Sequence, residues 1–116
     1  MRAAAVAAIL TSALAAPAIA ETRCGWVDNP TPGNWWLTDR DGTWTISTQG
    51  VPSVNGWDTI APFDLPGWVE TNGHYGFGCG CFEGSVDWST GEVAWMSSMR
   101  GIPMSRCHND PALPPR

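Results

Sequence analysis

The sequence predicts a mainly β fold: a small, disulfide-stapled antiparallel β-sheet or barrel-like domain that follows a helical N-terminal signal peptide. Three observations support this fold class. Residues 35–47 alternate between apolar and polar side chains around an Asp-Gly turn, as the two strands of a hairpin do. Four cysteines can cross-link a small exported domain, and eight tryptophans can supply the core that its few aliphatic residues cannot fill.

The first 20 residues have the order of charge and apolar residues that is typical of a secretory signal peptide. Arg2 precedes an apolar run over residues 3–16, and Pro17 is followed by an A-x-A cleavage site that ends at Ala20. This run is shorter than the ~20 apolar residues that a membrane-spanning helix needs. We therefore expect cleavage after Ala20, a periplasmic or secreted location, and no stable membrane insertion.

The chain that remains after cleavage is acidic and poor in aliphatic residues. Residues 21–116 carry five Arg, no Lys and eleven acidic residues, so their formal net charge is −6. A nucleic-acid partner is not expected, because such binding requires clustered cations that displace phosphate counterions. Leu, Ile, Val and Phe make up only 15 of these 96 residues. We expect tryptophan and cystine to form the core in place of these aliphatic residues. The sequence predicts one domain over residues 21–111 and a flexible tail over residues 112–116.

The hairpin of residues 35–47 is expected to turn at Asp41-Gly42, because type I′ turns favour this dipeptide. The expected cross-strand pairs are Arg40 with Thr43, Asp39 with Trp44, Thr38 with Thr45, Leu37 with Ile46, and Trp36 with Ser47. The face assigned to the core carries Trp35, Leu37, Trp44 and Ile46. Trp36 lies on the opposite, Thr-rich face, where it either stacks on a sugar ring or covers neighbouring chain. We name Trp36 as a candidate ligand-facing residue.

A second alternating run covers residues 74–82. Its two faces are Tyr75, Phe77, Cys79 and Cys81 on one side, and Gly76, Gly78 and Gly80 on the other. Glycines inside a strand mark a close approach of another group, so we expect one or two Trp rings on this glycine track; a chain-like ligand is the alternative. His74 either titrates near neutrality as a second candidate ligand-facing residue or simply ends the strand. Another hairpin is expected over residues 86–98.

The four cysteines, Cys24, Cys79, Cys81 and Cys107, are expected to form two disulfides, because exported proteins fold in an oxidising compartment. A direct bond between Cys79 and Cys81 would close a small, strained ring. Each is therefore expected to bond to a different one of the two terminal cysteines, and both resulting pairings remain open. The alternative is a thiolate site for copper(I) or zinc that uses Cys79, Cys81, Cys107 and His108. Its spacing fits no familiar site, and we expect no metal and no other cofactor.

Residues 49–67 contain three Pro and three Gly without a sustained period, which predicts a long loop of the kind that often carries function. Trp57, Phe63 and Trp68 are expected to attach this loop to the domain, and Trp57 is the third candidate ligand-facing residue.

The residue patterns do not indicate an enzyme. The sequence contains no nucleophile elbow, phosphate-binding loop or dinucleotide fingerprint. The acidic pairs Asp39–Asp41 and Asp58–Asp64 are of the type that glycoside hydrolysis uses, but so small a chain leaves little room for a deep cleft. We therefore expect a protein without catalytic residues.

Three strings of the chain are similar to a known family. They are CGWVDNPTPGNWWLTDRDGTWTISTQG at residues 24–50, WVETNGHYGFGCGC at residues 68–81 and CHNDP at residues 107–111. Together they resemble a family of small exported bacterial proteins, the domain of unknown function 4087, with mild departures at Gly80, Phe82 and Val51-Pro52. The resemblance implies export and the cysteine frame, and it carries no activity, cofactor or catalytic residue.

These observations lead us to expect a non-catalytic binding module for a protein or glycan of the cell envelope. It would present the loop of residues 49–67 and the face that carries Trp36. The alternatives are a structural or stress-related envelope protein without a specific ligand, a small hydrolase, or a thiol-metal protein.

Overall fold

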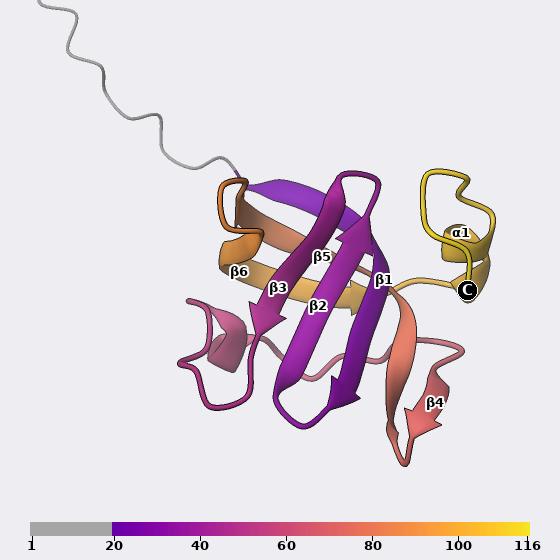
Figure 1. The fold of residues 1–116 in the computed structure, drawn as a ribbon, viewed down its shortest axis with the longest axis horizontal. Helices are drawn as coiled ribbons and strands as arrows, with labels where there is room; N and C mark the ends of the chain where they lie inside the picture. The colour runs from indigo at the N-terminus through magenta and orange to yellow at the C-terminus, as the bar shows by residue number, and fades with distance from the viewer. Residues whose placement is uncertain (1–19) are drawn as a thin grey trace, which may run out of the picture.

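The computed structural model describes residues 20–116 as six β-strands, a short 3-10 helix and one short α-helix (Figure 1). The elements are β1 (Glu21–Thr31), β2 (Asn34–Asp39), β3 (Gly42–Ser47), η1 (Trp57–Thr59), β4 (Val69–Asn72), β5 (Tyr75–Asp87), β6 (Glu92–Gly101) and α1 (Met104–His108). The predicted signal peptide spans residues 1–20, and residues 1–19 of it lie outside the described residues. Within residues 20–116, none of the helices has the length and apolar character needed to cross a membrane.

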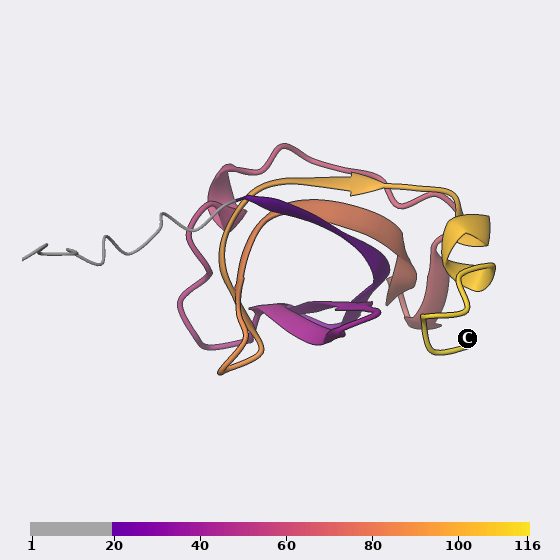
Figure 2. The ribbon, with the colours of Figure 1, turned by 90° about the horizontal axis from the view of Figure 1, so that it is seen from above.

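Five of the strands form a closed ring in the order β1-β2-β3-β6-β5-β1. β1 pairs with β5 over nine consecutive residue pairs and also pairs with β2. The ring closes on its other side through one parallel pair between β3 and β6, Thr45 opposite Glu92, and β4 extends the sheet beside β5. Seen from above, the strands surround one interior (Figure 2). The structure thus confirms the mainly β, barrel-like fold, and its strand order is that of a five-stranded Greek-key barrel.

The β2–β3 hairpin has its predicted faces but not its predicted register. Asp39 pairs with Gly42, so the turn is Arg40-Asp41 rather than Asp41-Gly42. The cause is Asp39, whose Oδ1 accepts hydrogen bonds from the backbone N–H of Asp41 (2.8 Å) and of Gly42 (3.2 Å). Among the described residues, only glycines have a positive φ, so Asp41 does not take the left-handed conformation of a type I′ turn. Each partner shifts by two positions, which preserves the buried face of Leu37, Trp44 and Ile46.

The second predicted hairpin is also present. β5 ends at Asp87 and the chain returns as β6 after a turn of residues 88–91. A Cβ atom at Gly78 would lie 2.9 Å from the Leu65 side chain and 3.1 Å from the Trp68 ring. The glycine track is therefore covered by the chain itself, as predicted, with Leu65 beside the Trp ring.

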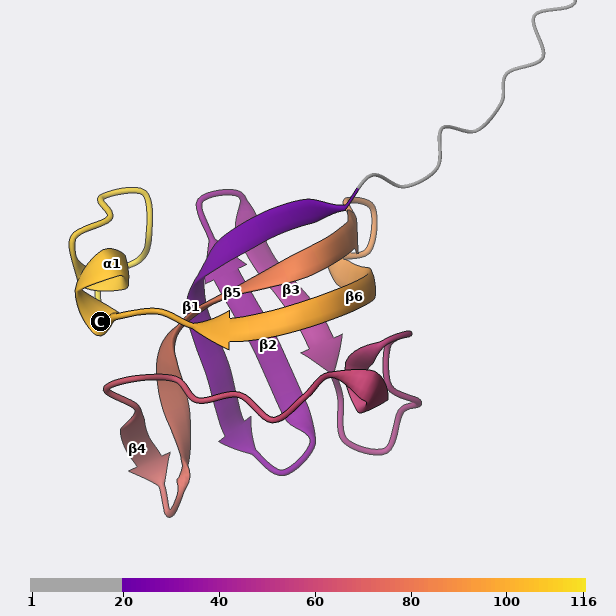
Figure 3. The ribbon, with the colours of Figure 1, turned by 180° about the vertical axis from the view of Figure 1, so that it is seen from behind.

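The segment between β3 and β4 is a long loop that contains only η1. It runs from η1 across the barrel to β4 (Figure 3). Trp57, Phe63 and Trp68 surround the half-buried Trp35, with ring centroids 5.4, 5.8 and 6.4 Å from the Trp35 ring. These three side chains attach the loop to the barrel, as the sequence predicts.

The main core fills the barrel and is built largely from strand residues. Its buried members are Val27, Leu37, Trp44, Ile46, Leu65, Phe82, Val93, Met96 and Met99. Only one of the eight tryptophans belongs to this set, and the others line its edge, form the second cluster described below or lie nearer the surface. Methionine and short aliphatic residues therefore contribute more to the core than the composition suggests.

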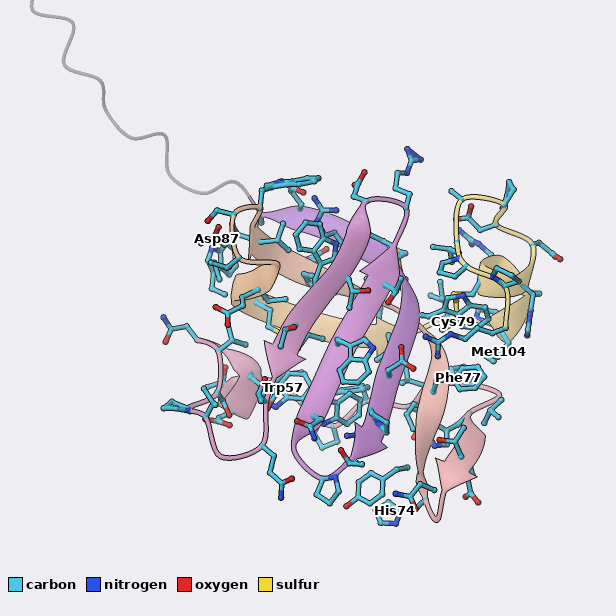
Figure 4. The ribbon with its side chains drawn as sticks, viewed as in Figure 1. Trp57, His74, Phe77, Cys79, Asp87 and Met104 are labelled. Atoms are coloured by element: carbon cyan, nitrogen blue, oxygen red, sulfur yellow. A yellow bond between two sulfur atoms is a disulfide. The ribbon has the colours of Figure 1, made fainter. Side chains whose placement is uncertain are left out.

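A second apolar cluster lies outside the barrel, where α1 and the C-terminal tail cover β1 and β5. Its buried members are Trp26, Cys79, Cys107 and Leu113. Phe77 and Cys79 of β5 and Met104 of α1 come together here (Figure 4). The Trp26 indole N–H donates to the Pro114 carbonyl (2.8 Å), and Arg116 binds Asp28 through its two terminal guanidinium nitrogens. The tail of residues 112–116 is thus packed on the barrel and differs from the flexible tail that the sequence suggests.

All four cysteines are bonded, in the pairs Cys24–Cys81 and Cys79–Cys107. Cys24 and Cys81 occupy opposite positions on β1 and β5, whereas the other bond attaches α1 to β5. The two predicted disulfides are present, and the pairing that the sequence left open is defined. The alternative thiolate metal site is excluded, because a disulfide sulfur is not a thiolate.

Candidate functional site

A groove of about 360 Å³ lies between β3, the start of β6 and residues 51–55. It arises because β3 and β6 share a single residue pair, after which the two strands separate. The groove has fixed walls: the Thr45 N–H donates to the Gly91 carbonyl (2.9 Å), and the Met96 N–H donates to the Asn55 carbonyl (3.0 Å). The groove therefore belongs to the barrel and also includes part of the predicted functional loop.

The side chains of the groove are mostly polar and mostly neutral. Its lining consists of Thr45, Ile46, Ser47, Thr48, Val51, Pro52, Ser53, Val54, Asn55, Asp87, Glu92, Val93 and Ala94. Hydroxyl, amide and carboxylate groups can exchange hydrogen bonds with a hydroxyl-rich ligand, and Val51, 58% exposed, adds an apolar edge. The lining contains no arginine, so an anionic ligand would find no counterion here.

Trp36 continues this surface onto β2. It is half-buried and lies opposite Thr45 of the groove in the β2–β3 register, and opposite Asp28 in the β1–β2 register. Further along the same face, the hydroxyls of Thr38 and Thr43 are 3.0 Å apart. The result is one aromatic ring among hydroxyl groups, beside a groove that is also rich in hydroxyls.

The other two predicted ligand-facing residues lie elsewhere. Trp57 is half-buried in the aromatic cluster around Trp35, and His74 is exposed at the turn between β4 and β5 (Figure 4). The His74 ring stacks on Tyr75 with centroids 4.2 Å apart, and its carbonyl accepts a hydrogen bond from the Trp68 indole (3.0 Å). The structure therefore does not bring Trp36, Trp57 and His74 into one site.

A buried ion cluster lies at one end of the barrel, where the start of β1 meets the β2–β3 turn. Arg23 has 8% of its side chain exposed and binds Glu21 (2.8 Å), Asp39 (2.8 Å) and Asp41 (3.1 Å). Burial alone would lower the pKa of Arg23, but the hydrogen bonds and negative charges of these carboxylates outweigh it and raise the pKa. A shallow pocket of about 370 Å³ opens beside the cluster, and Asp110 forms part of its wall.

Trp88, in the β5–β6 turn, extends this end of the barrel. Among the large hydrophobic residues that the structure describes, Trp88 is the most exposed, at 64%. The ring meets buried Trp44 edge-on at 4.9 Å, and the Arg23 guanidinium lies 5.2 Å from its centre. Sequence reasoning did not single out Trp88. The sequence feature that could have identified Trp88 is its position between Asp87 and Ser89, near the turn of a predicted hairpin.

Asp87 fixes the conformation of the turn that carries Trp88. Its Oδ1 accepts hydrogen bonds from the Ser89 hydroxyl (2.6 Å) and the Ser89 backbone N–H (2.8 Å). These bonds stabilise the ionised carboxylate, so the pKa of Asp87 is lowered from 3.8. The stabilisation that these hydrogen bonds give the turn is fully present above pH 3.8, and it is lost as the pH falls through the lowered pKa of Asp87.

Ser89→Ala is expected to raise the pKa of Asp87 toward 3.8, because it removes the hydroxyl donor and keeps the backbone donor. A carboxyl carbon NMR titration between pH 1.5 and pH 6 measures this shift. Ser97→Ala, at an exposed serine of β6, is the control and should leave the titration of Asp87 unchanged. An unaltered Asp87 titration in Ser89→Ala would contradict the contribution of the Ser89 hydroxyl to the lowered pKa of Asp87.

The two acidic pairs named from the sequence lie in different surroundings. Asp39 and Asp41 both bind the Arg23 guanidinium, whereas Asp58 and Asp64 are exposed on the long loop. The geometry of the first pair is therefore explained by the ion cluster.

The fold and these surfaces define a class of protein. It is a small barrel with two disulfides, a polar groove between β3 and β6, and a buried cluster of Arg23 with three carboxylates at one end. The model of a family described as protein of unknown function (DUF4087) matches residues 18–114, and the chain belongs to this family. No curated protein and no solved structure shows significant similarity to the chain. The disulfides are consistent with an extracellular or periplasmic location.

Proposed function

We propose that this protein is a non-catalytic binding module that holds a neutral glycan of the cell envelope in the β3–β6 groove, with Trp36 stacked on a sugar ring. The observation that carries the proposal is the continuity of the groove with the Trp36 face through Thr45, which belongs to both. A sugar offers an apolar ring face and a rim of hydroxyls. An aromatic ring beside Thr, Ser and Asn side chains suits both features.

The architecture supports this placement. Five-stranded Greek-key barrels such as the OB-fold use the face of their second and third strands to bind oligonucleotides and oligosaccharides. Trp36 and Thr45 lie on those two strands here. The formal charge of −6 over residues 21–116 and the absence of arginine from the groove lining disfavour the oligonucleotide.

Soluble, peptide-free glycan fragments built from N-acetylglucosamine carry no charge and are a direct probe of this proposal. We expect them to shift the NMR amide signals of Thr45, Ser47 and Ser53 and the indole signal of Trp36. Trp36→Ala should weaken binding about tenfold, which corresponds to ~1.4 kcal/mol of lost contact. Calorimetry on the folded variants measures the change.

Trp88→Ala is the matched control, because it also removes an accessible tryptophan but does so outside the groove lining. It should leave the affinity for the fragments unchanged. No binding by the wild-type protein would contradict the proposal and favour a structural envelope protein without a specific ligand. Equal loss in both variants would contradict the placement of the glycan in the groove.

A further inference from the structure

We infer that the end of the barrel around Trp88 is a docking surface for a basic protein, in which Trp88 is the anchor. This surface, the acidic end, comprises the start of β1, the β2–β3 turn and the β5–β6 turn, which lie at the same end of the barrel (Figure 1). Asp87 and Glu92 belong both to this surface and to the groove lining, but the inference does not rest on the proposed glycan site, because neither Trp88 nor Arg23 lines the groove.

Trp88 is exposed and yet held in place. It meets Trp44, which is 3% exposed, in an edge-to-face contact, and the Arg23 guanidinium lies beside both indoles at 4.8 and 5.2 Å from their centres. Arg23 is itself bound by three carboxylates, and the turn below the ring is fixed by the Asp87–Ser89 hydrogen bonds. A large ring that is already ordered loses little conformational freedom on binding, which is the property of an interface anchor.

The charge around the ring selects the partner. The ionisable groups of the acidic end are Glu21, Asp39, Asp41, Asp87 and Glu92 against Arg23 and Arg40. Five carboxylates and two guanidinium groups leave a formal charge of −3, half of the charge of residues 21–116. A positively charged surface is attracted to this end, whereas an anionic membrane or a nucleic acid is repelled.

Two other occupants fit less well. A second copy of the chain would bring two acidic ends together, and like charges oppose that contact. For a metal ion, the carboxylates of the cluster are already bound to Arg23, and the described residues hold no group of three or more ligands suited to a cation. A basic protein satisfies both the charge and the exposed ring.

The pocket beside the cluster provides a place for a cationic side chain of the partner. Glu21, Asp39, Asp41 and Asp110 contribute carboxylates to its lining, and Arg23 and Arg40 contribute the cations. A lysine or arginine of the partner that enters it would meet the carboxylates that Arg23 leaves incompletely neutralised. The Trp88 ring therefore requires an apolar recess on the partner, and the pocket requires a basic side chain at the rim of that recess.

The test uses hen lysozyme and horse cytochrome c as basic probes and serum albumin as an acidic one, with binding followed by calorimetry at 20 and 150 mM salt. We expect at least one basic probe to bind at both salt concentrations and albumin not to bind. Trp88→Ser should weaken that binding about tenfold or more, as loss of an anchor does. Trp88→Phe should restore part of it, and Glu21→Gln should reduce its salt dependence.

Val69→Ser, at an exposed apolar residue of β4 outside the groove lining and the acidic end, is the control, and it should bind the basic probe as the wild type does. Absence of binding to both basic probes would overturn the inference. So would binding that Trp88→Ser leaves unchanged, because such binding would depend on charge alone. Failure of the glycan proposal would instead appear as absence of fragment binding by the wild-type protein, with the effect of Trp88→Ser on basic-probe binding intact, so the two failures are distinguishable.

Discussion

Arg23→Met is expected to lower the free energy of unfolding by about 3–5 kcal/mol, because it leaves a buried carboxylate without its counterion. Arg23 and Asp39 have only 8% and 6% of their side chains exposed, and they form a 2.8 Å ion pair. Glu21 and Asp41, at 50% and 38% exposure, regain contact with water when the guanidinium is removed. Asp39 therefore accounts for most of the expected loss.

Urea unfolding of three variants checks this assignment. The double variant Arg23→Met/Asp39→Asn should recover part of the stability, because asparagine keeps the Oδ1 acceptor for the turn and removes the buried charge. Arg100→Met, at an exposed arginine of β6, should change the free energy of unfolding by no more than ~0.5 kcal/mol. Equal stability of Arg23→Met and the wild type would show that the ion cluster is not a structural element.

The same cluster explains why the hairpin register could not be predicted. The alternation of residues 35–47 determines which side chains face the core, and this part was correct. The turn position depends on Asp39, which is oriented by Arg23, a residue 16 positions away. A local rule for Asp-Gly turns contains no such long-range contact, so it placed the turn one residue too late.

The candidate site was predictable only in part. Trp36 follows from strand alternation, because a single aromatic on a Thr-rich face stands out in the sequence. The groove beside it depends on how β3 and β6 close the barrel, and a pairing between strands so far apart leaves no local pattern. Trp88 was missed for the opposite reason: the exposure of its ring depends on Trp44 and Arg23, which come from two other strands.

Loss of the disulfides is expected to have the largest effect on the protein. In the loop-entropy model, a bond across 57 residues such as Cys24–Cys81 contributes about 4 kcal/mol, and one across 28 residues such as Cys79–Cys107 about 3.5 kcal/mol. Small domains have a total stability of only ~5–15 kcal/mol. Removal of both bonds should therefore leave the chain largely unfolded at 37 °C.

The two single removals should differ in where the chain opens. Cys24–Cys81 joins residues that are already opposite each other on paired strands, so Cys24→Ala/Cys81→Ala should lower the unfolding midpoint without opening one region selectively. Cys79–Cys107 holds α1, whose Arg106 is exposed beside Cys107. Cys79→Ala/Cys107→Ala should therefore speed tryptic cleavage after Arg106 while the barrel stays folded.

Limited trypsin digestion with intact-mass readout, together with thermal unfolding of both variants, separates these expectations. The contacts of Pro114 with Trp26 and of Arg116 with Asp28 oppose release of the tail, so cleavage should accelerate further when Arg116→Ala is added to Cys79→Ala/Cys107→Ala. If cleavage after Arg106 is as slow as in the wild type, the tail is held by those noncovalent contacts alone. In that case the Cys79–Cys107 bond stabilises the barrel by restricting the unfolded chain, and not by attaching α1 to β5.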